Sequence, residues 1–237
     1  MKHPLITAIL LASIATPALG QRQVEMETGS SIPVPRRARI SNESGLTEQA
    51  QARRTLAEFA RCTVDRRSAE VSVIAAQPAE KLSDSRFMKI ADDECLSSGQ
   101  MRMRPLLMRA ALFVELYRRR DQAERRGAAW AVPAVAFDER AAVAGAATGG
   151  LALEVGLLSF ASCVIRHDAE AAKAVVLKPT ASKEQDAAFA ALAPHLGQCL
   201  PSGQNVKLSK PILEGALGEV LYRGTVPPTS PVSQEAR

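Results

Sequence analysis

The sequence has few of the residues on which enzymes most often depend. Its 237 residues include three histidines, four cysteines, one tryptophan and two tyrosines. His3 lies in an N-terminal segment that we expect to be removed, which leaves His167 and His195. The chain has no Gly-x-Ser-x-Gly or Ser-x-x-Lys signature of a serine nucleophile, and no glycine-rich stretch has the Gly-Lys-Ser/Thr ending of a phosphate loop. We therefore expect no catalytic residue and no cofactor.

Common metal-binding patterns are missing as well. The cysteines do not occur as Cys-x-x-Cys or Cys-x-x-x-x-Cys, and the histidines do not occur as His-x-x-x-His. Spacings of this kind are typical of zinc sites. A histidine without partners at a ligand spacing is usually a surface or structural residue. We expect no metal, and keep open the alternative of an enzyme with an unrecognised site near His167 or His195.

Long apolar runs are absent after the first 20 residues. Lys2, the apolar run from Leu5 to Ala15 and the sequence Ala18-Leu19-Gly20 predict a secretory signal peptide over 1–20, cleaved after Gly20. The apolar run is shorter than the roughly 20 residues that span a bilayer, although an uncleaved anchor is the alternative. We expect an exported protein, periplasmic or secreted, in which four cysteines are typical of structural disulfides.

What the chain does contain is an internal repeat. Cys95-Leu96-Ser97-Ser98-Gly99-Gln100 returns as Cys199-Leu200-Pro201-Ser202-Gly203-Gln204. Other residues recur in the same order, and they are of types that helices do not use freely: Phe59 and Phe160, Pro78 and Pro179, Gly99 and Gly203, Tyr117 and Tyr222. Apolar residues recur at helical spacings, and no segment alternates with a period of two. The pattern predicts an all-α fold of two pseudo-symmetric four-helix units, each stapled by one disulfide.

The repeat also sets the expected boundaries along the chain. The helix that starts at Pro105 is apolar almost all round through Tyr117, which predicts a buried, central position. We expect a helix from Ser83 or Asp84 to Leu96, and a kink or break at Pro194. The expected segments are a signal peptide (1–20), a disordered leader (21–45), helical unit one (46–126), an apolar linker (127–150), helical unit two (151–224) and a disordered tail (225–237).

The duplication selects one disulfide pattern. Four cysteines allow three pairings. A bridge that was present in the ancestral single unit must close within each copy, so we predict Cys62–Cys95 and Cys163–Cys199. Each bridge would join the first helix of a unit to the end of its third, and would stabilise that unit by about 3–4 kcal/mol in the chain-entropy account.

Charge gives weaker signals. The net charge of +5 is too small to imply a nucleic-acid partner, and we expect none. Basic residues gather where the buried helix of unit one ends, and there they complement the helix dipole: Arg118, Arg119, Arg120, Arg125 and Arg126. We expect a solvated face, with contact to another envelope protein or to an anionic surface as the alternative. The acidic run Asp92, Asp93 and Glu94 is also expected to be a solvated face.

The Cys-Leu-x-Ser-Gly and Ala-Leu-x-x-x-Leu-Tyr-Arg motifs resemble those of uncharacterised exported helical proteins of Gram-negative bacteria. The resemblance implies an exported location and brings no activity or ligand with it. Because every repeated residue has a packing role, we expect a non-enzymatic interaction or scaffold protein. A carrier of a small apolar ligand held between the two units is a further alternative.

Overall fold

The computed structural model describes residues 45–96, 101–130, 132–145, 150–200 and 208–225. In these ranges the chain forms nine α-helices and no β-strand, apart from an isolated bridge between Phe137 and Thr225. The all-α prediction is confirmed. Segment 1–20, nearly all of 21–45 and 225–237, and the repeated Gly99 and Gly203 lie outside the described residues. Among the helices that are described, none is long and apolar enough to cross a bilayer.

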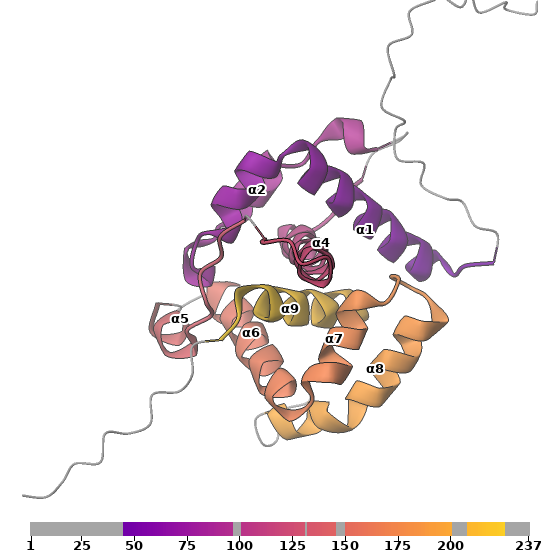
Figure 1. Ribbon diagram of the computed structural model, residues 1–237, viewed down its shortest axis with the longest axis vertical. Helices are drawn as coiled ribbons and strands as arrows, with labels where there is room; N and C mark the ends of the chain where they lie inside the picture. The colour runs from indigo at the N-terminus through magenta and orange to yellow at the C-terminus, as the bar shows by residue number, and fades with distance from the viewer. Residues whose placement is uncertain (1–44, 97–100, 131, 146–149, 201–207, 226–237) are drawn as a thin grey trace, which may run out of the picture. The chain divides into compact units, whose positions relative to one another are not determined.

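The helices follow one another in two runs, separated by a connecting segment (Figure 1). Three short 3-10 turns interrupt them: Ala79–Lys81, Asp93–Cys95 and Gly197–Cys199. The helices are α1 (Glu48–Arg66), α2 (Ser68–Ala75), α3 (Asp84–Lys89), α4 (Pro105–Arg125), α5 (Glu139–Gly145), α6 (Gly150–His167), α7 (Ala169–Leu177), α8 (Lys183–Leu196) and α9 (Lys210–Arg223).

The helix starts are those that local capping chemistry favours. Thr47, Asp168 and Ser182 each accept a hydrogen bond from a backbone N–H of the first turn that follows, at 3.2, 2.9 and 3.1 Å. Such caps satisfy amide groups that have no partner inside the helix. Pro105 and Pro211 occupy the first turns of α4 and α9, where a missing N–H has no cost.

Helices α4 and α9 form the centre of the fold. In Figure 1 α4 is seen almost end-on while α9 runs across the view, so the two helices cross steeply. Leu112, Phe113 and Leu116 of α4 are fully buried, which confirms the central position predicted for this helix. The crossing depends on Gly215, because a Cβ atom there would lie 2.1 Å from the Cβ of Ala110. Small residues at this point let the two backbones approach closely.

The other helices pack on either side of this pair. α1 and α3 contact α4, α6 and α7 contact α9, and α8 packs on α7. Figure 1 shows α1 and α2 on one side of the central pair and α6, α7 and α8 on the other. A single hydrophobic cluster runs through both sides.

One helix prediction is wrong in detail. The helix expected from Ser83 or Asp84 to Leu96 ends at Lys89, and the chain continues to a 3-10 turn at Asp93–Cys95. There the Asp92 carboxylate accepts the Glu94 backbone N–H at 2.9 Å, a local bond that competes with helix formation. Of the kink or break expected at Pro194, the break does not occur, because α8 runs through Pro194 to Leu196 and then tightens into a 3-10 turn.

The segment expected as an apolar linker contains α5 and lies against the end of α9. Phe137 donates its backbone N–H to the Gly224 carbonyl at 2.8 Å. The Trp130 indole N–H donates to the Tyr222 hydroxyl at 3.1 Å, and that hydroxyl is 3.2 Å from the carbonyl oxygen of Val132. The only tryptophan of the chain therefore covers one of the two repeated tyrosines.

Candidate functional site

Two disulfides join the cysteines in the pattern that the duplication predicts. Cys62 is bonded to Cys95, and Cys163 is bonded to Cys199. The Cα atoms are 5.6 and 5.7 Å apart, within the usual range for a disulfide. Each bridge ties a long helix, α1 or α6, to a 3-10 turn later in the chain.

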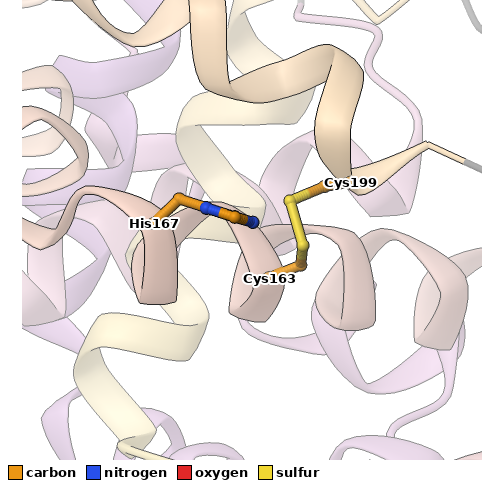
Figure 2. Close-up of side chains that lie close together, drawn as sticks. All are labelled: Cys163, His167 and Cys199. Carbon is orange, nitrogen blue, oxygen red and sulfur yellow. A yellow bond between two sulfur atoms is a disulfide. The ribbon is translucent and has the colours of Figure 1, made fainter.

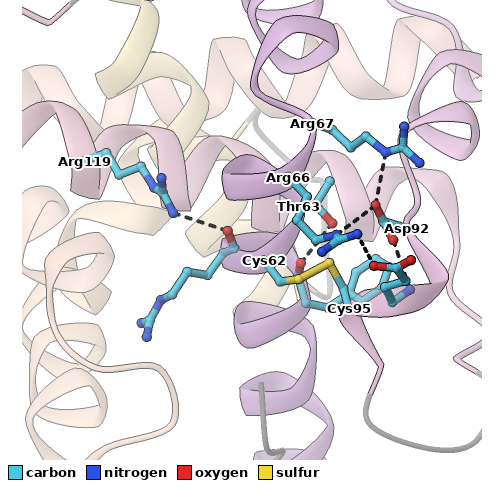
Figure 3. Close-up of a disulfide and its surroundings, with 10 residues drawn as sticks. Cys62, Thr63, Arg66, Arg67, Asp92, Cys95 and Arg119 are labelled. Atoms are coloured by element: carbon cyan, nitrogen blue, oxygen red, sulfur yellow. Dashed lines mark hydrogen bonds and ion pairs between the residues drawn. A yellow bond between two sulfur atoms is a disulfide. The ribbon is translucent and has the colours of Figure 1, made fainter. Parts of the chain in front are cut away.

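Beside the first disulfide lies a buried carboxylate (Figure 3). Asp92 accepts hydrogen bonds from Arg66 at 3.2 Å and from Arg67 at 3.1 Å. Burial alone would raise the pKa of Asp92, but the Glu94 amide and the guanidinium groups of Arg66 and Arg67 lower it below its ordinary value. Asp92 is only 6% exposed, so the prediction that the acidic run forms a solvated face is wrong for this residue.

Beside the second disulfide lie His167 and His195, the two histidines among the described residues. His167 follows Cys163 by one turn of α6, and its imidazole points toward the Cys163–Cys199 bridge (Figure 2). The ligand atoms of Cys163, His167 and Cys199 all lie within 4.8 Å of one another. His195 precedes Cys199 by four residues, and its ring stacks on that of His167 with centroids 6.3 Å apart. The Nε2 atom of His195 is 3.6 Å from the Asp168 carboxylate.

The sequence contained a signal for this cluster that a search for His-x-x-x-His overlooks. Cys163 and His167 are spaced as Cys-x-x-x-His, and His195 and Cys199 as His-x-x-x-Cys. Residues four apart on a helix share one face. The Cys163–Cys199 disulfide then brings these two cysteine–histidine pairs together.

Two arginines of the repeated Leu-Tyr-Arg motif make matching long-range contacts. Arg118, in α4, donates to the carbonyl oxygens of Val176 and Lys178 at 2.7 and 3.0 Å. Arg223, in α9, donates to those of Ala75 and Gln77 at 3.2 and 2.7 Å. Both acceptor pairs lie where a short helix ends, and carbonyl groups there have no intrahelical partner. Each arginine thus caps the C-terminus of a helix in the other half of the chain.

The same two arginines also form ion pairs with buried glutamates of α9. Arg109 holds Glu219 through two hydrogen bonds of 2.8 Å, and Arg223 donates to Glu219 at 2.8 Å as well. Glu214 lies between Arg118 at 3.2 Å and Arg53 at 3.1 Å. Burial would raise the pKa of Glu219, but Arg109 and Arg223 lower it below the ordinary value.

A polar cleft lies between the end of α4 and α7. Its volume is about 1050 Å³, and seven basic and four acidic side chains line it. Four of the five arginines predicted to gather here line the cleft, the exception being Arg126. Their surroundings differ from one uniform solvated face: the side chains of Arg118 and Arg119 are 16% and 25% exposed, whereas that of Arg125 is 70% exposed.

Tyr117 contributes to the wall of this cleft. Burial raises the pKa of Tyr117, as it does that of its repeated counterpart Tyr222. Two smaller cavities, one beside Glu214 and one beside Glu219, each measure only about 20 Å³, roughly the space of one water molecule. They have no room for an organic ligand.

Comparison with protein-family models, with curated protein sequences and with solved structures finds no match to this chain.

Proposed function

We propose that the chain is an exported helical interaction protein, built from two duplicated units, that binds a segment of another envelope protein in the cleft between α4 and α7. The observation that carries this proposal is the cleft itself. It is open, polar and large, and its lining has an excess of basic side chains. These features favour an extended polypeptide with acidic side chains over a small apolar ligand.

The internal contacts support the duplication. The alignment that matches Pro78 with Pro179 also matches Ala75 and Gln77 with Val176 and Lys178. The two arginines of the repeated motif therefore cap equivalent carbonyl groups in opposite units. The alignment that matches Tyr117 with Tyr222 likewise matches Ala110 with Gly215, the two positions in contact where α4 crosses α9. An approximate twofold axis would bring equivalent residues together in this way, so the contact supports the proposed duplication.

The cleft marks the place where the two halves differ. α4 continues past its Leu-Tyr-Arg motif to Arg125, whereas α9 ends at Arg223. The repeated tyrosine of α9 is covered by Trp130, whereas Tyr117 of α4 lines the open cleft. We assign partner binding to the side of the molecule that carries Tyr117.

Export is supported by the two disulfides, since such bridges persist in oxidising compartments. The carrier alternative has less support, because the cavities beside Glu214 and Glu219 are too small for a ligand. The stacking of His167 on His195 supports the enzyme alternative. The neighbouring sulfur atoms are joined in a disulfide and are not free nucleophiles.

The test is co-purification from the native envelope with quantitative mass spectrometry. Lys178→Glu reverses a charge in the cleft, and Lys89→Glu makes the same change at an exposed site outside it. We expect K178E to reduce recovery of the partner by about tenfold, because like charges then face one another across the interface. K89E should retain the partner. Equal recovery with both variants would remove the cleft from the proposal.

A further inference from the structure

The four side chains around the second disulfide form a ligand set that metal proteins use. Cys163 and His167 lie one turn apart on α6, and His195 and Cys199 lie four residues apart at the end of α8. Two thiolates and two imidazoles make up the Cys₂His₂ set of many structural zinc sites. Here each helix end supplies one ligand of each kind.

The distances fit a site that can close around an ion. In a tetrahedral zinc site the ligand atoms lie roughly 3.3–3.8 Å apart, given Zn–S and Zn–N bonds of about 2.3 and 2.0 Å. The ligand atoms of Cys163, His167 and Cys199 already lie within 4.8 Å of one another. His195 completes the set if its side chain rotates from Asp168 toward His167, whose ring is 6.3 Å away between centroids.

The first disulfide provides an internal comparison. In the aligned copies, His167 corresponds to Arg66, and His195 corresponds to Ala91. In the first bridge Cys62 is half-buried and Cys95 almost completely buried, whereas Cys163 and Cys199 are both half-buried and His167 is exposed. Only the second copy combines two cysteines, two histidines and access from solvent. A bridge with a purely structural role needs none of these additions.

We infer that Cys163, His167, His195 and Cys199 form a zinc-binding site when the Cys163–Cys199 disulfide is reduced. The co-reactant is a dithiol, which gives two electrons and two protons to the disulfide and is itself oxidised to a disulfide. The two resulting thiols lose their protons to solvent as Zn²⁺ binds, and the histidines bind through neutral imidazole nitrogens. In the reverse direction a small-molecule disulfide accepts two electrons from the two thiolates and two protons from solvent and becomes a dithiol, which restores the bridge and releases the ion.

The helix α6 is thus tied to the end of α8 in either state, by a disulfide or by an ion. The metal site shares no lining residue with the cleft between α4 and α7. Its presence therefore does not depend on partner binding, and the experiments on the two sites can fail separately.

The experiment titrates the reduced full-length chain with Co²⁺ and then displaces it with Zn²⁺. Tetrahedral thiolate ligands give cobalt strong charge-transfer and ligand-field bands, which report the ligand type directly. We expect one equivalent to bind to the reduced protein and none to bind with these bands to the oxidised protein. H167A and H195A should each weaken binding by about 100-fold or more, because each removes one of four ligands.

The chain offers a matched control. C163S/C199S retains Cys62 and Cys95, so thiolate bands in that reduced variant would place the metal elsewhere and overturn the inference. C62S/C95S should still bind one equivalent. Unchanged zinc affinity in both H167A and H195A would also refute the site. Because His167 is exposed and His195 is partly exposed, both variants should have the same helix content as the wild type by circular dichroism.

Discussion

Replacing Arg223 with methionine removes a buried cation while keeping most of the side-chain volume. The Arg223 side chain is completely buried. It pairs with Glu219, donates to three backbone carbonyl groups and lies with its guanidinium carbon 4.7 Å from the centre of the Phe113 ring. Methionine can fill the space beside Phe113. It cannot donate to any of the four oxygen acceptors.

The expected cost follows from what remains unpaired. Breaking a buried ion pair by removing one partner costs about 3–5 kcal/mol, since the remaining charge is left in a medium of low polarity. Glu219 keeps its two bonds to Arg109, which favours the lower half of that range. The carbonyl groups of Ala75 and Gln77 lose their donor and add to the cost. A protein of this size loses about 2–4 °C in Tm for each kcal/mol, so we expect a loss of at least about 6 °C.

The pH dependence tests the same argument. Glu219 has a pKa below its ordinary value of 4.5 in the folded protein, so its contribution is complete above that value and is lost as the pH falls through the folded pKa. In Arg223→Met the carboxyl loses one of its two cations, and its folded pKa rises. The stability difference between wild type and variant should therefore be largest near neutral pH and smaller below about pH 4.

Thermal and urea unfolding followed by circular dichroism measure the effect. Arg125→Met is the control, because Arg125 pairs only with Asp121 of its own helix and its side chain is 70% exposed. Arg125→Met should have the same Tm as the wild type. A Tm for Arg223→Met within 2 °C of the control, or a stability difference that does not change with pH, would show that the buried contacts of Arg223 do not stabilise the fold as argued.

Three further predictions concern the α4–α9 crossing, the first disulfide and the N-terminal segment. Gly215→Ala should lower the free energy of unfolding by at least about 2 kcal/mol, because the added methyl group overpacks the α4–α9 crossing. Gly156→Ala is the control: nothing lies near its added methyl group, so it should raise the free energy of unfolding by up to about 1 kcal/mol. Urea titration measures both values. Replacing Cys62 and Cys95 with alanine should cost about 3–4 kcal/mol, and non-reducing peptide mapping should show the other bridge unchanged. N-terminal sequencing of exported protein should begin immediately after Gly20; a sequence that begins at Met1 would contradict export by cleavage.

The parts of the fold that local chemistry decides could be predicted from the sequence. Helix caps at Thr47, Asp168 and Ser182 and the burial of α4 follow from residue type and spacing alone. The end of helix α3 at Lys89 could also be predicted from the sequence, because three consecutive acidic residues near a helix C-terminus oppose the helix dipole. The hydrogen bond from the Glu94 amide to the Asp92 carboxylate, which competes with the helix, contradicts the solvated face predicted for Asp92.

The contacts that could not be predicted depend on distant parts of the chain. No neighbouring residue in the sequence indicates that the hydrogen-bond acceptors of Arg118 and Arg223 lie in distant helices, because every residue has a backbone carbonyl group and residue type does not show which carbonyl is unpaired. The pairing of His167 with His195 likewise depends on the bend between α7 and α8. Their spacing to Cys163 and Cys199 gave a partial signal, because a mixed cysteine and histidine pair four residues apart shares a helix face.

The exchanged arginines explain why this chain works as one domain. A segment of about 75–80 residues has a marginal core of its own, and α2 and α7 each end with carbonyl groups that accept hydrogen bonds from an arginine. The donor for those carbonyls is Arg223 in one case and Arg118 in the other, so each comes from the opposite unit. Because neither arginine can cap its target in an isolated half, the disulfides hold each half together while the arginines and the α4–α9 crossing hold the halves to each other.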